Sequence, residues 1–589
     1  MEMNLPRRRM LGLAAGAALG GPLGVTAAAG QAAGNAAEPY GRLFDVKGYG
    51  AAGDGQAKDT AALQKAIDAC HDGRGGVVYF PPGNYLTGTI QLKSNVTLYL
   101  HVGATLLGSP DLPDYNLYGQ ISQNTNSQAQ PRHLVYAKNA ENIGIAGQGR
   151  IDGNGRSFWR LMTKAEIEEV LLQRPEGGKV AQDWWRWRDR PAQMVQFEDC
   201  RNVRIEGVRI ENSPFWAVHP VRCDTVLIDG VIIRNALYGP NADGIDPDGC
   251  TNVMISNCDI YTCDDAIVIY CGSRGAEGAR SRNITVTNCV LCTTCNALKI
   301  NWLGANASVE NVTFSNCALY GDPHPKDTGN SPFWPELQDF RTMSGIHLDT
   351  PITSQIRGLT ISNITMEDVR NPIFMRTTNR QGRGAQEPAG AGAKGTVRDV
   401  LIDNVFARGQ SLTSMITGLP GHDIENVSVS NMRITTVEGG RPEWAHREPP
   451  EFETDYPEAI MLGNLPSYGM YCRHVNGLKL RDVEYVGEKA DPRPALMLDD
   501  VKNADIDSFT ASAPESGEPF IRFRDVDGAF VRGCRAPSGV GTFLAVSGKG
   551  SRKITIMGND LSDARQAATT DDDAPVGVVF QSANRMPEA

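Results

Sequence analysis

Apolar and polar residues alternate in one short pattern that recurs along most of the chain. Each copy is a strand-like alternation, then a turn at Asn, Asp or Gly, then a second apolar strand. Clear copies are NVRIEGVRI at 202, NVMISNCDI at 252, NITVTNCVL at 283 and DVLIDNVFA at 399. The period is roughly 22–30 residues where no insertion intervenes, and strands repeated at that spacing without helices favour a parallel solenoid.

The pattern predicts an all-β fold, a right-handed parallel β-helix over residues 40–560. A leucine-rich repeat fits less well, because its leucine framework is missing. One amphipathic helix precedes the repeats, with Asp59 or Thr60 at its N-cap. Its apolar stripe consists of Leu63, Ala66, Ile67 and Cys70. We expect this helix to cover the first coil, since an open edge of strands invites aggregation.

Two kinds of residue recur at fixed places in the repeat. Asparagine occupies one turn position in six copies, at Asn257, Asn288, Asn316, Asn363, Asn404 and Asn431. An internal row of these amides, each bonded to the next coil, would leave no buried polar atom unpaired. Cysteine follows three of them, at Cys258, Cys289 and Cys317. A buried row of small side chains explains these cysteines better than disulfides do.

Insertions interrupt the coils at 155–190, 320–342, 378–397 and 438–468. The first contains a predicted helix, AEIEEVLLQ, and the aromatic cluster Trp184, Trp185 and Trp187. On a solenoid such insertions gather on one face, and we expect them to form a groove. Residues 561–589, which include TTDDDAP, are expected to be a weakly ordered tail.

The N-terminal residues 1–36 have the composition of an export signal and linker. Arg7, Arg8 and Arg9 precede a weakly apolar run rich in Gly and Ala, an order that resembles a twin-arginine signal. A single membrane anchor is the alternative. We expect an exported protein, periplasmic or extracellular, with no stable membrane insertion once the signal is removed, and a monomer. The net charge of −11 argues against a nucleic-acid partner.

Aspartates are concentrated in residues 241–265, NADGIDPDGCTNVMISNCDIYTCDD. Asp243 lies one predicted coil away from the pair Asp264–Asp265. Carboxylates that share one site repel each other, so at least one of them should keep its proton to higher pH. A proton donor beside an ionised base is what hydrolysis of a glycosidic bond requires. Aspartates that merely cap turns are the alternative interpretation.

Alignment of the repeats brings further polar residues to the same place. Gly244-Ile245-Asp246 aligns with Ala266-Ile267-Val268, then with Ala297-Leu298-Lys299, then with the flanks of Ile346. In this register Asp243 lies beside Asp265, and Asn296 comes next in the row. Neighbouring coils are about 4.8 Å apart, so these side chains should meet.

The chain resembles glycoside hydrolase family 28, the polygalacturonase and rhamnogalacturonase family. The resemblance runs from about Phe44 past residue 480 and includes DVKGYGAAGDG, FPPGNYLTG, SPFWAVHPV and the spacing from Asn241-Ala242-Asp243 to Asp264-Asp265. It implies an inverting hydrolase of pectic polysaccharides or oligosaccharides that needs no metal or cofactor. By resemblance, Asp264 is the general acid, and Asp243 and Asp265 hold and deprotonate the attacking water.

Two stretches depart from the family pattern. Cys295-Asn296-Ala297 stands where most members have Gly-His-Gly, and His347-Leu348-Asp349 stands where most have Arg-Ile-Lys. The cations that bind a substrate carboxylate are therefore missing from their usual place, and Lys299, Arg376 or Arg380 could replace them. The substrate-binding candidates are Asn241, Asp246, Asn296, Lys299, His347, Asp349, His219 and Arg376.

Two other functions remain open at this point. A polysaccharide lyase on the same fold would need calcium-binding acids and a basic Lys or Arg, for which Lys299 is the candidate. A non-catalytic glycan-binding β-helix is the second alternative. Among hydrolases, the number of insertions favours an enzyme that acts on chain ends or short oligosaccharides.

Overall fold

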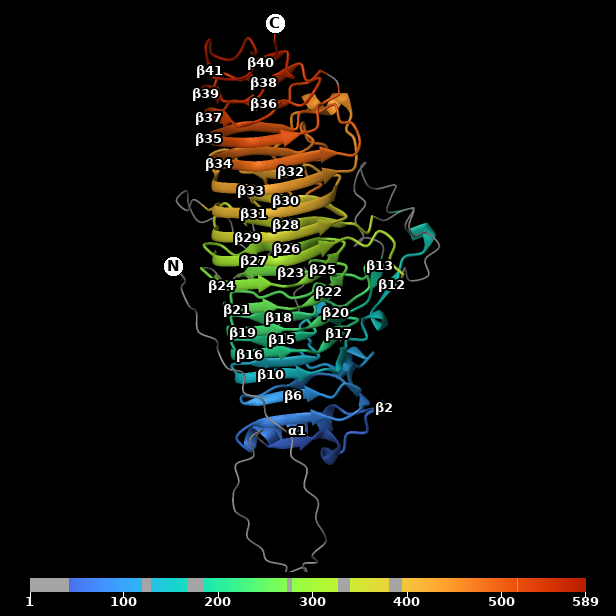
Figure 1. The fold of residues 1–589 in the computed structure, drawn as a ribbon. Coiled ribbons are helices and arrows are strands. Elements are labelled where there is room, and N and C mark those ends of the chain that lie inside the picture. Colours follow the sequence, from blue (N-terminus) through green and yellow to red (C-terminus); the bar gives the residue numbers. More distant parts are fainter. Residues whose placement is uncertain are drawn as a thin grey trace, which may run out of the picture. The chain divides into compact units, whose positions relative to one another are not determined.

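The computed structural model describes residues 42–118, 129–166, 169, 185–272, 278–326, 339–380, 395–515 and 517–588. In these residues the strands of the coils pair in parallel with the equivalent strands of the next coil (Figure 1). One coil contains β21 (Thr251–Ser256), β22 (Asp259–Thr262) and β23 (Ile267–Cys271), whose partners are β24, β25 and β26 of the next coil. The fold is the expected right-handed parallel β-helix, with three sheets along its length.

The first sheet takes one strand from nearly every coil. Its strands, in order of pairing, are β1 (Leu43–Asp45), β3 (Gly76–Phe80), β6 (Val96–Leu100), β10 (Glu141–Gly147), β16 (Arg201–Glu206), β19 (Asp224–Asp229), β21, β24 (Arg280–Thr287), β27 (Ser308–Tyr320), β29 (Gln355–Glu367), β31 (Thr396–Gln410), β33 (Ile424–Thr436), β34 (Met470–Gly487), β35 (Leu496–Ala511), β37 (Asp527–Arg532), β39 (Arg552–Met557) and β41 (Val579–Ser582).

The second sheet contains β2 (Asp54–Lys58), β4 (Gly83–Thr87), β7 (Ala104–Gly108), β11 (Arg150–Asp152), β17 (Arg209–Glu211), β20 (Ile232–Arg234), β22 and β25 (Val290–Thr293). Beyond β25 the long strands from β27 to β35 continue round the turn, and their later residues extend this sheet.

The third sheet carries the residues discussed below. Its strands are β5 (Ile90–Gln91), β9 (Val135–Lys138), β15 (Val195–Glu198), β18 (Val218–Val221), β23, β26 (Asn296–Leu303), β28 (Thr342–Pro351), β30 (Val369–Thr378), β32 (Ser414–Thr417), the first residues of β34 and β35, β36 (Ile521–Arg524), β38 (Thr542–Ser547) and β40 (Gln566–Thr570). Between β18 and β23 the chain bridges at Ile245 and Asp248. Two short pairs lie outside these sheets, β8 (Ala129–Gln130) with β14 (Arg190–Pro191) and β12 (Trp159–Leu161) with β13 (Trp185–Trp187).

The core is a set of aligned apolar side chains inside the coils. In the third sheet Ile245, Ile267, Leu298, Ile346 and Ile373 follow one another in register, and each is fully buried. Complete burial of such a side chain stabilises the fold by roughly 1.5–3 kcal/mol. Because the pattern alternates, the residues next to these point outwards from the sheet.

The helix α1 (Thr60–Asp72) covers the first coil, as predicted, and contacts β1, β3, β5 and β6. Its buried face is the predicted stripe of Leu63, Ala66, Ile67 and Cys70. Asp59 is the N-cap residue but makes no side-chain cap; its carboxylate instead accepts from the backbone N–H groups of Ala52 (2.6 Å) and Gly53 (2.9 Å).

The asparagine row forms, but the prediction that it is internal is wrong. Asn363 donates to the side-chain oxygen of Asn316 (2.9 Å), and Asn404 donates to that of Asn363 (2.7 Å), yet all three are exposed. Each has φ near +55° to +57°, at the turn between the first and second sheets. Asparagine tolerates this left-handed conformation, which is why it recurs at the turn.

The other repeat prediction is confirmed. All thirteen cysteines are free and buried, and the register places Cys258, Cys289 and Cys317 beside each other in successive coils.

The end of the chain differs from the prediction. Instead of a weakly ordered tail after residue 560, β40 pairs with β38 and β41 pairs with β39. Of the run TTDDDAP, the two threonines end β40 and the residues from Asp571 onward form the turn to β41, so the segment contributes another coil to the stack.

The insertion at 438–468 begins with the short 3-10 helix η5 (Pro442–His446) and then crosses the outer face of the third sheet. Ala459, Leu462 and Leu465 pack there against a second hydrophobic cluster that includes Phe374, Met415, Tyr471 and Met497. The remaining short 3-10 helices are η1 (Val46–Tyr49), η2 (Leu112–Asp114) and η3 (Gly155–Ser157).

Several predicted features lie outside the described residues. They are the export segment, most of the predicted helix at 165–173, Trp184, the side chains of Trp185 and Trp187, and large parts of the insertions at 320–342 and 378–397. In the part of the chain that the structure describes, no helix is long and apolar enough to cross a membrane.

The asparagine row generates a test of stability. Asn404 has φ +56°, a left-handed conformation that alanine adopts less readily than asparagine. Replacing Asn404 by Ala therefore strains the backbone, and it also removes the side-chain hydrogen bond to Asn363. We expect a loss of about 1–2 kcal/mol of unfolding free energy, seen as a lower Tm in calorimetry. Asn404→Gly keeps the backbone conformation accessible and should lower the Tm less. Equal losses for the two variants would show that backbone conformation does not explain the asparagine.

Candidate functional site

The register of the third sheet brings the predicted polar residues together. Ile245, Ile267, Leu298 and Ile346 are aligned in four successive coils, as the repeat pattern predicted. The backbone N–H of Gly244 donates to the carbonyl of Asp265 (2.9 Å), and that of Ala266 donates to the carbonyl of Asn296 (2.9 Å). Two lines of side chains result: Asp243, Asp265 and Asn296 in one, and Asp246, Val268, Lys299 and His347 in the other.

The turn between β22 and β23 presents Asp264 and Asp265. Two threonines from the next coil hold it: the hydroxyl of Thr293 donates to the carbonyl of Asp264, and the hydroxyl of Thr294 donates to the carbonyl of Cys263 (2.5 Å). Both aspartates are buried. The neighbouring coil therefore determines where this pair of carboxylates lies.

Asp265 is the carboxylate with the most partners. It accepts from the Nζ of Lys299 (2.9 Å), from the side-chain amide of Asn296 (2.6 Å) and from the backbone N–H of Asn296 (3.1 Å). Burial disfavours the ammonium of Lys299, but Asp265 together with neighbouring groups such as Tyr456 and Asp349 outweighs it, and the pKa of Lys299 is raised well above its usual value. The arrangement is a buried ion pair with the carboxylate charged.

Asp264 lies beside this ion pair in a different state. Its Oδ1 accepts from the backbone N–H of Asp265 (2.9 Å), and its Oδ2 accepts from the side chain of Asn241 (3.3 Å). Burial and the charge of Asp265 raise the pKa of Asp264 to about 6. Burial, together with the charge of Asp264, also raises the pKa of Asp243 well above its usual value. These two carboxyl groups can therefore hold protons to higher pH than an ordinary aspartate.

A chain of hydrogen bonds leads from Asp265 to Asp349. The side-chain oxygen of Asn296 lies 3.0 Å from Nδ1 of His347, and Nε2 of His347 lies 2.7 Å from Oδ2 of Asp349. Burial and Lys299 lower the pKa of His347 well below its usual value, and burial raises the pKa of Asp349 well above its own. A protonated Asp349 thus donates to a neutral His347, which donates to Asn296, which donates to Asp265.

Asp246 belongs to the line of side chains that contains Lys299 and His347. His219 occupies the same line one coil before Asp246. Burial and the charge of Asp265 raise the pKa of Asp246 well above its usual value, and neither of its oxygens has a hydrogen-bond partner among the described residues. The Nδ1 of His219 lies 2.8 Å from the side-chain oxygen of Gln196. Trp216, from the stretch SPFWAVHPV, meets the ring of His219 edge-on and stacks on Tyr270.

Arg190 holds Asn241, and the sequence contained no sign of this role. Its guanidinium donates to Oδ1 of Asn241 and to the carbonyls of Pro214 and Pro240, each at 2.9 Å. Burial lowers the pKa of Arg190 to about 9. Arg190 ends an insertion with no periodic pattern, so only the fold brings it to Asn241.

Arg376 contacts the insertion at 438–468 instead of an open surface. Aligned with Asp349 in the next coil, it donates to the hydroxyl of Thr417 (3.2 Å) and to the carbonyls of Glu451 and Phe452. Burial lowers its pKa to about 10. As a substrate-binding residue Arg376 remains a prediction; in the described structure it fastens the insertion.

The insertion also places an aromatic ring beside the ion pair. The ring centroid of Tyr456 lies 5.9 Å from the Nζ of Lys299 and 4.8 Å from the guanidinium of Arg380. Tyr456 was not predicted, because it is more than 150 residues from Lys299 in the sequence.

The residues Tyr471, Arg473 and His474 support the same insertion. Tyr471 is buried in the second hydrophobic cluster and donates to Asp499 (2.7 Å). His474 lies between Asp500 (2.6 Å) and Glu451 (3.1 Å), and these hydrogen bonds raise the pKa of His474 to about 9 although burial opposes this.

One group among the described residues has the donor atoms for a metal ion. Carboxylate oxygens of Asp264 and Asp265 and the Sγ of Cys295 lie within 4.8 Å of one another. The ammonium of Lys299 already neutralises Asp265, and the chemistry described above uses carboxyl groups alone.

Comparison with known proteins agrees with this site. The family model described as glycosyl hydrolases family 28 matches residues 93–322, which include Asp243, Asp246, Asp264 and Asp265. A probable polygalacturonase of Vitis vinifera is 25% identical over 399 residues, which cover 66% of this chain and 73% of that protein. An exo-poly-alpha-D-galacturonosidase of Dickeya chrysanthemi is 32% identical over 260 residues, covering 38% and 41% respectively.

A solved structure extends the agreement to the fold. The exopolygalacturonase of Thermotoga maritima superposes with a TM-score of 0.51 at 26% identity, covering 67% of this chain and 87% of that one. The clustered carboxyl groups, the parallel β-helix and these matches lead to one conclusion. Over residues 93–322 the chain matches glycosyl hydrolase family 28, and it is an O-glycosyl hydrolase.

Proposed function

We propose that this protein hydrolyses α-glycosidic bonds of pectic galacturonan by a single inverting displacement. The observation that carries the proposal is the contrast between two adjacent aspartates. Asp265 is paired with Lys299, while Asp264 has a pKa of about 6. The names of the relatives from Vitis vinifera and Dickeya chrysanthemi support galacturonan as the substrate.

In this proposal Asp264 is the general acid. It carries a proton in mildly acidic solution and gives it to the glycosidic oxygen that leaves. Asn241 and the backbone N–H of Asp265 orient its carboxyl group. Both donate to the ionised form, so they also stabilise the carboxylate that remains after the proton has gone.

The attacking water is assigned to Asp265 and Asp243. Asp265 stays ionised because Lys299 and Asn296 bind its oxygens, so it can accept the proton of the water. Asp243 is aligned with it one coil earlier, about 4.8 Å away along the stack, and one of its oxygens has no hydrogen-bond partner among the described residues. A water held between the two would attack the face of the sugar opposite the leaving oxygen.

The insertion at 438–468 supports action at chain ends. It packs on the outer face of the third sheet in the coils after Lys299, and Tyr456 lies against Lys299 itself. A polymer that lay across Asp264 would meet this insertion on one side. We therefore propose exo-action, in which the insertion receives the end of the chain.

Loss of the acid gives the most direct test. Asp264→Asn should lower kcat on homogalacturonan by about 10²–10⁴-fold, because the leaving oxygen is no longer protonated. Reducing ends are measured, with the Tm as a check of folding. Asp563→Asn, at an exposed aspartate, is the matched control and should keep full activity. Full activity in Asp264→Asn, or an unsaturated product that absorbs in the ultraviolet, would overturn the proposal; the second result would indicate a lyase.

The ion pair predicts a particular dependence on pH. In the native protein kcat should fall about tenfold per pH unit above pH 6, as Asp264 loses its proton. Lys299 lowers the pKa of Asp264, so in Lys299→Met this fall should begin at higher pH. The maximal kcat should also drop by about 100-fold, because Asp265 is left without its cation. Lys479→Met, at an exposed lysine, is the control. An unshifted profile in Lys299→Met would refute the electrostatic coupling.

Exo-action predicts the products. From the first minutes of digestion, chromatography of homogalacturonan digests should show only monomer or dimer, and the viscosity should fall slowly relative to the release of reducing ends. An endo-acting enzyme would instead produce a ladder of oligomers and a rapid loss of viscosity.

A further inference from the structure

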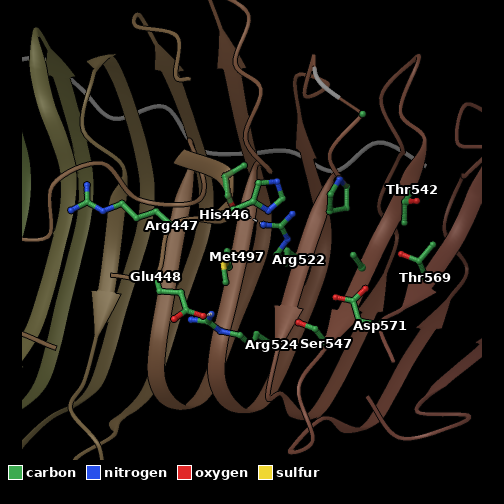
Figure 2. A pocket seen from close by; sticks show the side chains of 14 residues that line it. His446, Arg447, Glu448, Met497, Arg522, Arg524, Thr542, Ser547, Thr569 and Asp571 are labelled. Carbon is green, nitrogen blue, oxygen red and sulfur yellow. Dashed lines mark hydrogen bonds and ion pairs between the residues drawn. The ribbon is translucent and has the colours of Figure 1, made fainter. Parts of the chain in front are cut away.

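The C-terminal coils contain a pocket that the catalytic proposal does not use (Figure 2). Its volume is about 450 Å³, within the roughly 300–1,000 Å³ typical of ligand pockets. The floor is the outer face of the third sheet at β36, β38 and β40. The walls are residues 445–448, at the start of the insertion, and residues 517–519, just before β36.

The size of the side chains explains why the sheet is hollow here. Met497, Arg522, Ala545 and Thr569 occupy one row in four successive coils. The large side chains of Met497 and Arg522 are thus followed by the smaller Ala545 and Thr569. These smaller residues form the floor between the two walls of the pocket. Ser547, two residues after Ala545 on the same strand, adds a second hydroxyl to the floor.

Several charged groups in the pocket are arranged as pairs. Arg524 donates to both oxygens of Asp499 (2.8 and 2.6 Å) and to Glu448 (3.2 Å). Arg522 is paired with Glu518. Glu518 also lies 2.8 Å from Nε2 of His446. Figure 2 shows the side chain of Arg447 directed away from Arg522 and Arg524.

The pocket is separate from the catalytic residues. Arg522 lies in the row of Lys299, six coil steps further along, which at about 4.8 Å a step is about 29 Å. The insertion fills the space between them, because Leu462 and Leu465 pack on the intervening coils.

We propose that this pocket binds an uncharged sugar residue of a polysaccharide. Fixed pairs of Arg and carboxylate offer donors and acceptors side by side, which suits neighbouring sugar hydroxyls. Thr569 and Ser547 add hydroxyl groups, while Met497 and Pro519 offer apolar contact for the face of a ring. A uronate would have to compete with the carboxylates that already hold Arg522 and Arg524, so a neutral sugar fits better. The proposal does not rest on the catalytic function.

The test is binding to the full chain with Asp264→Asn, so that no substrate is consumed. Galactose, arabinose, rhamnose and galacturonate are each titrated and followed by calorimetry and by saturation-transfer NMR. We expect at least one neutral sugar to bind. Adding Ala545→Phe, which fills the floor, should weaken that binding at least tenfold, and Thr569→Val, which removes only a hydroxyl, should weaken it by a smaller factor. Ala61→Phe, at an exposed alanine of α1, should leave it unchanged.

Each other outcome contradicts the proposal. No binding of any neutral sugar would overturn it, as would neutral-sugar affinities that neither Ala545→Phe nor Thr569→Val changes. Tighter binding of galacturonate than of the neutral sugars, lost in Ala545→Phe, would make the pocket a uronate site. If Ala545→Phe does not fold, Thr569→Val decides alone. The native chain's activity on homogalacturonan is measured separately, so failure of the catalytic proposal is distinguishable from failure of this one.

Discussion

The buried ion pair between Lys299 and Asp265 is the interaction on which the proposed active site depends. A lone carboxylate in this interior would take up a proton, as Asp243 and Asp246 tend to do. The ammonium at 2.9 Å and the amide of Asn296 stabilise the carboxylate of Asp265. Asp264, next to that charge, holds its proton to about pH 6. One interaction therefore separates an acid from a base among groups of the same chemical type.

The solenoid assembles this interaction from successive coils, each of which contributes only one or two residues. The aspartates come from two coils, Asn296 and Lys299 from the next and His347 from the one after. Parallel pairing aligns these residues in coils about 4.8 Å apart, a distance that side chains can bridge with hydrogen bonds. Where most members of the family have a histidine and a cationic pair, this chain has a neutral chain from Asp349 to Asn296 that ends on Asp265. The residues that depart from the family pattern thus provide hydrogen bonds to the carboxylate of Asp265.

The outer face of the third sheet changes character along the stack. Around β26 and β28 it is polar and buried, and around β30 to β35 it is apolar and covered by the insertion. Around β36 to β40 it is hollow and lined by paired charges and hydroxyls. A regular backbone can carry such different surfaces because the inward row alone forms the core. Outward-facing residues are not part of the core inside the coils, so their side chains can differ from one part of the stack to another.

Periodicity made the fold and the core of the site predictable. The alternation identified the strands, and the register from Ile245 to Ile346 followed from it, so Asp243, Asp265 and Asn296 were correctly brought together. The same reasoning failed where the period did not distinguish inside from outside. The row of asparagines was expected to be internal, but it is exposed. These asparagines occupy a turn in the left-handed conformation, and the pattern of apolar residues does not indicate on which side of the turn their side chains lie. The acidic stretch near residue 570 suggested a tail, but it is a turn between two paired strands.

The sequence by itself determined the solenoid, the alignment of its coils and the cluster of aspartates, because each is encoded in residues that recur at short, regular intervals. Only the tertiary structure decided which carboxylate carries the charge. That choice depends on Lys299 and Asn296 approaching within hydrogen-bonding distance across coils. It also decided that Tyr456, Arg190 and Arg376 belong to the site or its support, and that the C-terminal coils enclose a pocket. These residues come from insertions and distant coils, and their contacts arise from packing that no periodic pattern encodes.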